Sequence, residues 1–119
     1  MPHIVLEHSS NLFEKHEITK VFHQIHAFLS EALPTNLANC KSRAYECKTC
    51  NIGNGDPKNA FVHLTLKILP GRPDGVLQAL GKRLMDLLSV SFPHSMADLN
   101  LDITLEICEL STAYFKNER

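Results

Sequence analysis

The chain carries one hydrophobic pattern twice. Each copy has a segment of alternating apolar residues, then apolar residues three and four apart, then a second alternating segment. Alternation is typical of a half-buried strand, and spacings of three and four are typical of an amphipathic helix. The first unit covers about residues 2–50 and the second about residues 59–110, with a loop at 51–58 rich in Gly, Asn and Pro between them. The pattern therefore predicts two successive strand–helix–strand units.

The boundaries of the elements follow from turn residues and prolines. Strands are predicted at 2–8, 42–50, 60–68 and 99–108, and helices at about 12–33 and from 73 to just before Pro93. Ser9 to Asn11 supply turn and N-cap chemistry before the first helix, and Pro34 ends it. The second helix has an apolar stripe of Val76, Leu77, Leu80, Leu84, Leu87 and Leu88. The tail at 111–119 is polar and is expected to be free unless a neighbour holds it.

These elements define an α/β fold with two layers (α+β). A crossover of roughly 20 helical residues suits two parallel strands, so each unit predicts a parallel pair. Together they predict a four-stranded mixed sheet with both helices on one face, in a single domain over residues 1–119. The other face mixes Phe61, His63 and Thr65. An open mixed face is poorly buried at this length, so we expect it to pack against other subunits.

Composition excludes several classes of partner. With 12 basic and 13 acidic residues the formal net charge is −1, which does not suit nucleic acid or an anionic membrane surface. The N-terminus has neither the basic region nor the long apolar region of a secretory signal, and no apolar run approaches the roughly 20 residues of a membrane helix. In such a chain the four cysteines are expected to be reduced thiols, and the protein is expected to be cytoplasmic.

Pro2 is the first residue with possible chemistry. Removal of Met1 would leave a secondary amine at the start of the first strand, whereas within the chain the same nitrogen is an amide without basicity. α-Amino groups titrate at about 7.7–8.0, and an apolar pocket with cations nearby lowers that pKa further. A base near neutral pH suits proton abstraction beside a carbonyl group. Taken alone, however, Met-Pro is a common start of a chain and indicates nothing.

Cations lie at two junctions between strands and loops. Arg72 stands between Gly71 and Pro73 where the second helix begins, and a guanidinium beside a helix N-terminus suits a carboxylate. Lys41 and Arg43 are two positions apart at the start of the second strand, so both point to one side of it. Each of these is, in isolation, better explained as an exposed polar residue.

Two patterns suggest metal ions only weakly. Cys47 and Cys50 have the spacing of a zinc or redox pair, but a structural zinc site needs four ligands and no second close pair follows. The motif is also predicted within a strand, not at the start of a helix as in redox domains. His23 and His26 share one face of the first predicted helix. We therefore expect no metal site.

Together, the proline, the duplicated pattern and the cations resemble the tautomerase superfamily. Within it, the chain is most similar to the 5-carboxymethyl-2-hydroxymuconate isomerase family of bacterial homoprotocatechuate degradation. The resembling segments span nearly the whole chain: Met1 to Glu7, Lys41-Ser42-Arg43, Ala60 to Ile68, Gly71-Arg72 and the last strand through Glu106. The strand at 60–68 followed by Gly71-Arg72 is the most specific of them.

The resemblance implies a homotrimer whose sheets pack around a central axis. It also implies an isomerase that shifts a proton in an unsaturated polycarboxylate, without metal or organic cofactor. In this hypothesis Pro2 is the catalytic base, and Arg43, Arg72 and Lys41 bind the small-molecule carboxylate substrate.

One departure affects the substrate. The family pattern tends to read Arg-Ser-Arg where this chain has Lys41-Ser42-Arg43, and lysine keeps the charge but lacks the bidentate geometry of arginine. Position 41 therefore bears on the identity of the substrate.

Three alternative hypotheses stay open. In the first, the protein is a tautomerase of a different, phenylpyruvate-like enol. In the second, it is a trimeric binding protein without activity that retains Met1, and in the third, it is a small zinc module using Cys47 and Cys50.

Overall fold

The computed structural model describes residues 2–118. Its elements follow in the order β1 (His3–Ser9), η1 (Lys15–Glu17), α1 (Ile18–Ala32), η2 (Leu37–Asn39), β2 (Lys41–Cys47), β3 (Asn59–Ile68), α2 (Asp74–Ser89), α3 (Pro93–Asp98) and β4 (Asn100–Glu109). The strands form one sheet in the order β2-β1-β3-β4. β1 and β2 are parallel, β3 and β4 are parallel, and β1 and β3 are antiparallel. The predicted mixed sheet of two strand–helix–strand units is confirmed.

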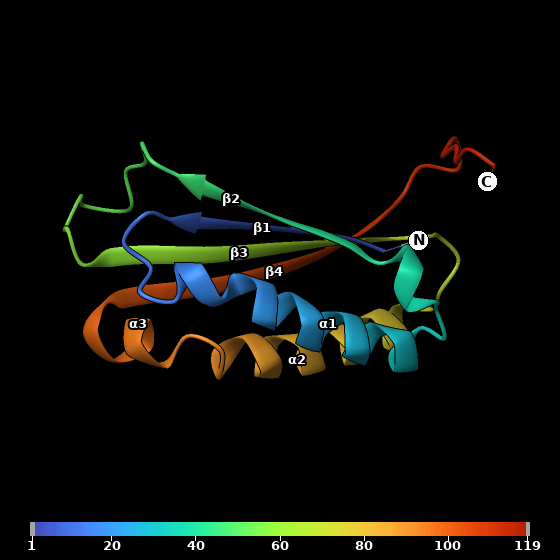
Figure 1. Cartoon of the computed structure of the whole chain (residues 1–119), viewed down its shortest axis with the longest axis horizontal. Helices are drawn as coiled ribbons and strands as arrows, with labels where there is room; N and C mark the ends of the chain where they lie inside the picture. Colours follow the sequence, from blue (N-terminus) through green and yellow to red (C-terminus); the bar gives the residue numbers. More distant parts are fainter. Residues whose placement is uncertain (1, 119) are drawn as a thin grey trace.

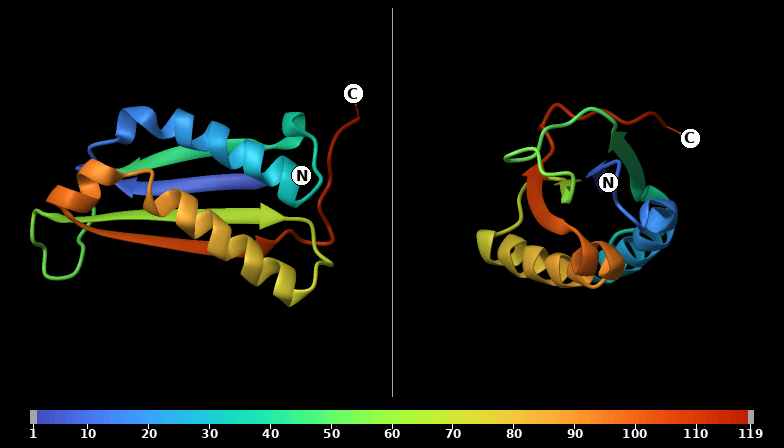
Figure 2. Two further views of the ribbon diagram at one scale, coloured as in Figure 1. Left: turned by 90° about the horizontal axis from the view of Figure 1, so that it is seen from below. Right: turned by 90° about the vertical axis from the view of Figure 1, so that its left-hand side faces the viewer.

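Both long helices cover the same face of the sheet (Figures 1 and 2). Their apolar stripes pack against the alternating residues of the strands in one core, which includes Ile4, Leu6, Val21, Ile25, Leu29, Val62, Leu64, Leu66, Leu80, Leu84, Leu88 and Phe92. The stripe predicted for α2 is buried at Leu80, Leu84 and Leu88, but Val76 is 43% exposed. Val76 lies in the first turn of α2, where the helix extends beyond the core.

In the described part of the chain, no helix covers the opposite face of the sheet (Figure 2). Along β3, buried residues alternate with half-buried ones, so that Phe61, His63, Thr65 and Lys67 lie on this open face as predicted. His63 Nδ1 lies 2.7 Å from the Thr104 hydroxyl, and its Nε2 lies 3.9 Å from the Glu106 carboxylate. The open face is therefore partly polar and partly apolar, which is unusual for a surface that only meets water.

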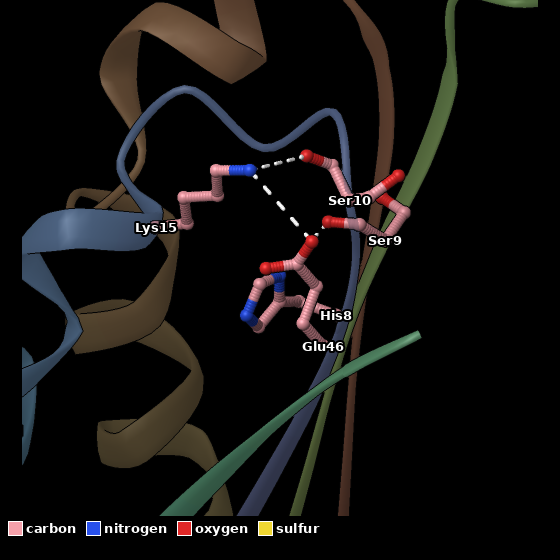
Figure 3. A network of polar contacts seen from close by, with 5 residues as sticks. All are labelled: His8, Ser9, Ser10, Lys15 and Glu46. Atoms are coloured by element: carbon pink, nitrogen blue, oxygen red, sulfur yellow. Dashed lines mark hydrogen bonds and ion pairs between the residues drawn. The ribbon is translucent and has the colours of Figure 1, made fainter. Parts of the chain in front are cut away.

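The first helix begins later than predicted. Residues 12–17 do not continue α1 but form a turn and η1, because the side chains of Glu14 and Lys15 bind other parts of the chain. The carboxylate of Glu14 accepts hydrogen bonds from α3, and Lys15 Nζ donates to the Ser10 carbonyl at 3.2 Å and lies 3.7 Å from Glu46 (Figure 3). Beside them, His8 Nδ1 donates to the Ser9 carbonyl at 2.8 Å. Ser9 is the last residue of β1 and not part of the turn.

Two further boundaries differ from the prediction. Pro93 does not merely follow α2 but opens a short helix, α3, where its fixed φ and missing N–H are tolerated. The strand predicted at 42–50 ends at Cys47, because its last partner is Ser9 and β1 stops there. Cys50 consequently lies in the exposed loop and not in a strand.

The tail after β4 has no helix or strand in residues 110–118, as predicted, but it contacts its own chain. It leaves the end of β4 and crosses the open side of the sheet towards β2 (Figures 1 and 2). The Tyr114 hydroxyl lies 2.9 Å from His3 Nε2, and Lys116 Nζ donates to Asn39 Oδ1 at 3.4 Å. Within residues 2–118, no helix is both long and apolar enough to cross a membrane.

Candidate active site

The sheet topology gathers the predicted site residues at one end of the molecule. β1 and β2 begin at this end, and β3 and β4 finish there, because His3 pairs with both Lys41 and Lys67 and Ile68 pairs with Glu109. Pro2 precedes β1, Lys41 opens β2, and Arg72 lies in the loop after β3 (Figure 1). Together with Arg43, two positions after Lys41, these residues are spread over 71 positions of the sequence but share one end of the sheet.

Pro2 is buried and firmly connected to the sheet. It continues the alternation of buried and half-buried residues along β1, which puts it on the same side as Ile4. Its carbonyl accepts a hydrogen bond of 3.1 Å from the backbone N–H of Lys41. Most chain ends fray, whereas a residue bonded into a sheet is held in place. Met1, whose removal would free the nitrogen of Pro2, lies outside the described residues.

Lys41 and Arg43 lie on the same side of β2, as their spacing predicted, and this side belongs to the open face. Their partners on β1 are His3 and Val5, which also lie on that face. Lys41 is exposed, and its Nζ donates to the Asn39 carbonyl at 3.4 Å. Arg43 is half-buried, and its Nη1 lies 3.3 Å from His3 Nδ1. The ring of Pro2 and the side chain of Arg43 therefore lie on opposite faces of the sheet.

The loop between β3 and α2 positions Arg72. Gly71 has φ of +110°, a conformation that side-chain-bearing residues rarely adopt, and its N–H donates to the Glu109 carboxylate at 2.9 Å. Half-buried Arg72 then donates from Nη1 to the Leu69 carbonyl at 3.2 Å. A guanidinium has five N–H donors, so this single bond orients the group and leaves it capacity for an anion.

His3 lies among the candidate site residues, and the sequence analysis did not include it. It lies on the open face beside three cations, Lys41 and Arg43 of β2 and Lys67 of β3. Burial, and then the positive charges of Arg43, Lys41 and Lys67, lower the pKa of His3 below 6.5. The ring is therefore neutral at neutral pH. Its position after Pro2 was the only signal in the sequence, and nothing there indicated its contact with Tyr114.

The residues considered for metal binding are not assembled into a site. Within residues 2–118, no group of three or more His, Cys, Asp or Glu side chains is placed to hold a metal ion. Cys47 and Cys50 are both free thiols. The ring of His26 is hydrogen-bonded to the hydroxyl of Ser42, while His23 is exposed. Burial and the charge of His23 lower the pKa of His26.

A cavity of about 400 Å³ lies elsewhere, between α2 and the edge strand β4. Leu77, Met85, Leu105 and Ile107 line it together with polar residues of α2. It includes none of Pro2, Lys41, Arg43 and Arg72, so the size of this cavity does not identify the site. The candidate site is better identified by the burial of Pro2 and by the cations at the same end of the sheet, because these features bear directly on proton transfer and anion binding.

Comparison with known proteins identifies the family of the chain. The 5-carboxymethyl-2-hydroxymuconate isomerase family matches residues 2–118. The Escherichia coli 5-carboxymethyl-2-hydroxymuconate Delta-isomerase is 32% identical over 110 residues, which are 92% of this chain and 87% of that protein. A crystal structure of a 5-carboxymethyl-2-hydroxymuconate isomerase from Deinococcus radiodurans R1 superimposes with a TM-score of 0.85 at 30% identity, covering 98% of this chain and 90% of that one.

A more distant structure shares the fold. A fused 4-OT wild type symmetric trimer has a TM-score of 0.69 at 12% identity and covers 98% of this chain and 93% of that one. The family match over residues 2–118, the 32% identity to the Escherichia coli enzyme and the shared fold agree, and the chain belongs to the 5-carboxymethyl-2-hydroxymuconate isomerase family and is an isomerase.

Proposed function

We propose that the protein isomerises 5-carboxymethyl-2-hydroxymuconate, with the N-terminal amine of Pro2 as the general base after removal of Met1. The amine takes the proton from the 2-hydroxyl group, and the electrons left on oxygen form the 2-oxo group while the double bonds shift. The protonated amine then gives a proton to a carbon of the former dienol. No proton is gained or lost overall, and the amine returns to its starting state.

The observation that carries this proposal is the burial of Pro2 where the sheet holds it. A general base must keep a fixed distance to the substrate, and the bond from the Lys41 N–H to the Pro2 carbonyl restrains the residue without using its nitrogen. Burial and nearby cations both disfavour the protonated amine, which keeps a base available near neutral pH.

The cations at this end of the sheet are proposed to bind the carboxylates of the substrate. Arg72 and Arg43 would each hold a carboxylate, and Lys41 would add positive charge at the rim. A guanidinium close to the 2-oxo oxygen would also stabilise the negative charge that develops there. These roles are supported by position and chemistry, since a substrate with several carboxylates needs several cations at one place.

A homotrimer is the proposed assembly. The open face carries Val5 and Phe61 among polar residues, and packing against further copies of the chain would cover them. The more distant neighbour described as a symmetric trimer supports this choice. In such an assembly the open face of one subunit, with Arg43, lies against the next subunit. Arg43 would then reach the Pro2 of a neighbour, since the sheet separates it from the Pro2 of its own chain.

Two measurements test the proposed function. Intact mass of protein expressed without a tag should lack one methionine, and ultraviolet absorbance should show loss of the dienol of 5-carboxymethyl-2-hydroxymuconate. Retention of Met1 would remove the base and leave the binding-protein alternative. A free proline with activity only on phenylpyruvate enol would keep the chemistry but change the substrate. Activity on 5-carboxymethyl-2-hydroxymuconate would place the protein in the breakdown of aromatic compounds, which we propose takes place in the cytoplasm.

A further inference from the structure

We propose that Tyr114, in the C-terminal tail, and His3, in β1, form a relay that orients the guanidinium of Arg43 towards the substrate. His3 and Tyr114 would be positioning residues, since they act through Arg43. The inference rests on the proposed function, because it assumes that Arg43 binds a carboxylate of the substrate. It adds a role for the tail, a segment that the sequence predicted only to be polar and free unless a neighbour holds it.

The hydrogen-bond capacities of the three side chains determine how the protons are arranged. Arginine can only donate, so His3 Nδ1, 3.3 Å from Arg43 Nη1, must be the acceptor. The neutral ring then carries its proton on Nε2, which lies 2.9 Å from the Tyr114 hydroxyl. The Tyr114 oxygen therefore accepts from Nε2, and this bond holds the His3 ring in the orientation that points Nδ1 at Arg43.

The rings of His3 and Tyr114 are also packed together. Their centroids are 6.0 Å apart with an angle of 75° between the planes, an edge-to-face arrangement. Both residues are half-buried, although the neighbouring Phe115 is 90% exposed. Tyr114 thus connects the tail to β1 at a single aromatic contact, and Lys116 reaches Asn39 beside β2. The tail consequently passes the end of the sheet where β1 begins, and His3 lies between Tyr114 and Arg43.

The relay should respond to pH. Groups that face His3 are Lys41 and Arg43 from β2, Lys67 from β3 and Tyr114 from the tail, so every charge around it is positive. These charges and burial lower its pKa and keep the ring neutral near pH 7. Once protonated, His3 has donors on both nitrogens, repels the guanidinium and can no longer accept from it. Arg43 is then released from its orientation.

Steady-state kinetics on 5-carboxymethyl-2-hydroxymuconate separates this role from a merely structural one. Tyr114→Phe keeps the ring and removes one hydrogen bond, so KM should rise about two- to tenfold with kcat little changed. His3→Phe, which removes the acceptor, should raise KM at least as much. His3→Asn places an amide oxygen near the position of Nδ1 and should restore KM. Tyr45→Phe is the matched control, because Tyr45 is an exposed tyrosine of β2 outside the relay, and its KM should not change.

Binding of muconate, a dicarboxylate without the 2-hydroxyl group, gives the second readout. Between about pH 7.5 and about pH 5, calorimetry should show that wild-type protein loses affinity relative to His3→Asn, which cannot titrate. An equal pH response of the two proteins, or an unchanged KM in both Tyr114→Phe and His3→Phe, would overturn the relay.

Arg43→Ala distinguishes failure of the relay from failure of the proposed carboxylate-binding role of Arg43. If this variant has a raised KM while the Tyr114 and His3 variants do not, the relay is wrong and the proposed role of Arg43 stands. If Arg43→Ala leaves KM unchanged, the carboxylate role of Arg43 is wrong and the relay falls with it. Thermal unfolding of each variant, measured alongside, identifies any change in KM that arises from loss of the fold.

Discussion

The hydroxyl of Ser95 donates to the carboxylate of Glu14 over 2.6 Å, a contact between residues 81 positions apart. The same carboxylate accepts from the backbone N–H groups of His94 (2.7 Å) and Ser95 (3.3 Å) at the start of α3. Both Glu14 and Ser95 are buried, at 3% and 0% exposure. A buried carboxylate is stable only when it is hydrogen-bonded in this way, so the pair joins the segment before α1 to α3.

Glu14→Gln should lower the free energy of unfolding by about 1–3 kcal/mol, since it weakens hydrogen bonds to a buried charged group. Urea unfolding at neutral pH measures this change. Glu17→Gln is the control, because Glu17 is exposed and its replacement should change stability by less than about 0.5 kcal/mol. Equal effects of the two substitutions would show that the Glu14 contacts contribute nothing.

The stabilisation by Glu14 should also depend on pH. Burial raises the pKa of the carboxyl group, but the hydrogen bonds from Ser95 and from the backbone of His94 and Ser95 outweigh it, and the net pKa is below 4.5. Since the folded pKa is the lower one, the contribution is complete above about 4.5 and is lost as the pH falls through the folded value. The stability difference between wild type and Glu14→Gln should therefore shrink between about pH 5 and pH 3. A difference that grows on acidification would contradict this.

Pro2→Ala should reduce turnover by at least about tenfold without unfolding the protein. A general base typically contributes about 10²–10⁴-fold, and a primary amine at the same place differs in basicity and position. The backbone bond between the residue-2 carbonyl and Lys41 is kept, so circular dichroism and thermal unfolding should match wild type. Intact mass must first confirm removal of Met1 in both proteins. Unchanged kcat would exclude Pro2 as the base.

Arg72→Ala should weaken binding of the substrate by about 1–3 kcal/mol, the value of a charge-assisted hydrogen bond. Arg83→Ala removes the same charge from the helix layer, where Arg83 lies 4.6 Å from the centroid of the Phe28 ring. The control should reduce stability by about 0.5–1 kcal/mol through the lost cation–π contact and leave KM unchanged. Should Arg72→Ala change only the thermal midpoint, Arg72 is structural.

Val5→Asp should dissociate the proposed trimer. Val5 lies between Arg43 and Thr65 on the open face, and a carboxylate there would lose its hydration on assembly. Light scattering during gel filtration should give three times the mass of one chain for wild type and a lower mass for the variant. Val90→Asp, at a position 76% exposed after α2, should leave the assembly intact. A trimer that persists in Val5→Asp would show that the open face is not the interface.

Periodicity alone predicted the sheet, its helices and its core, because burial of one face imposes a repeat of two on strands and near 3.6 on helices. Thus the alternate residues from Val62 to Ile68, and Leu80, Leu84 and Leu88, could be assigned to the core without any tertiary information. The early end of β2 and the late start of α1 could not be predicted from periodicity. They depend on where β1 stops and on the bonds between Glu14 and α3, which join residues far apart in the chain.

The candidate site divides in the same way. The sequence by itself determined the chemistry available, because Pro2, Lys41, Arg43 and Arg72 are the residue types that a proton shift on a polycarboxylate requires. Only the tertiary structure decided that they share one end of the sheet, that Arg43 lies on the open face, and that His3 and Tyr114 join it. The physical reason is that local periodicity specifies which side of an element is buried, whereas the register between strands and the path of the tail depend on contacts across the whole fold.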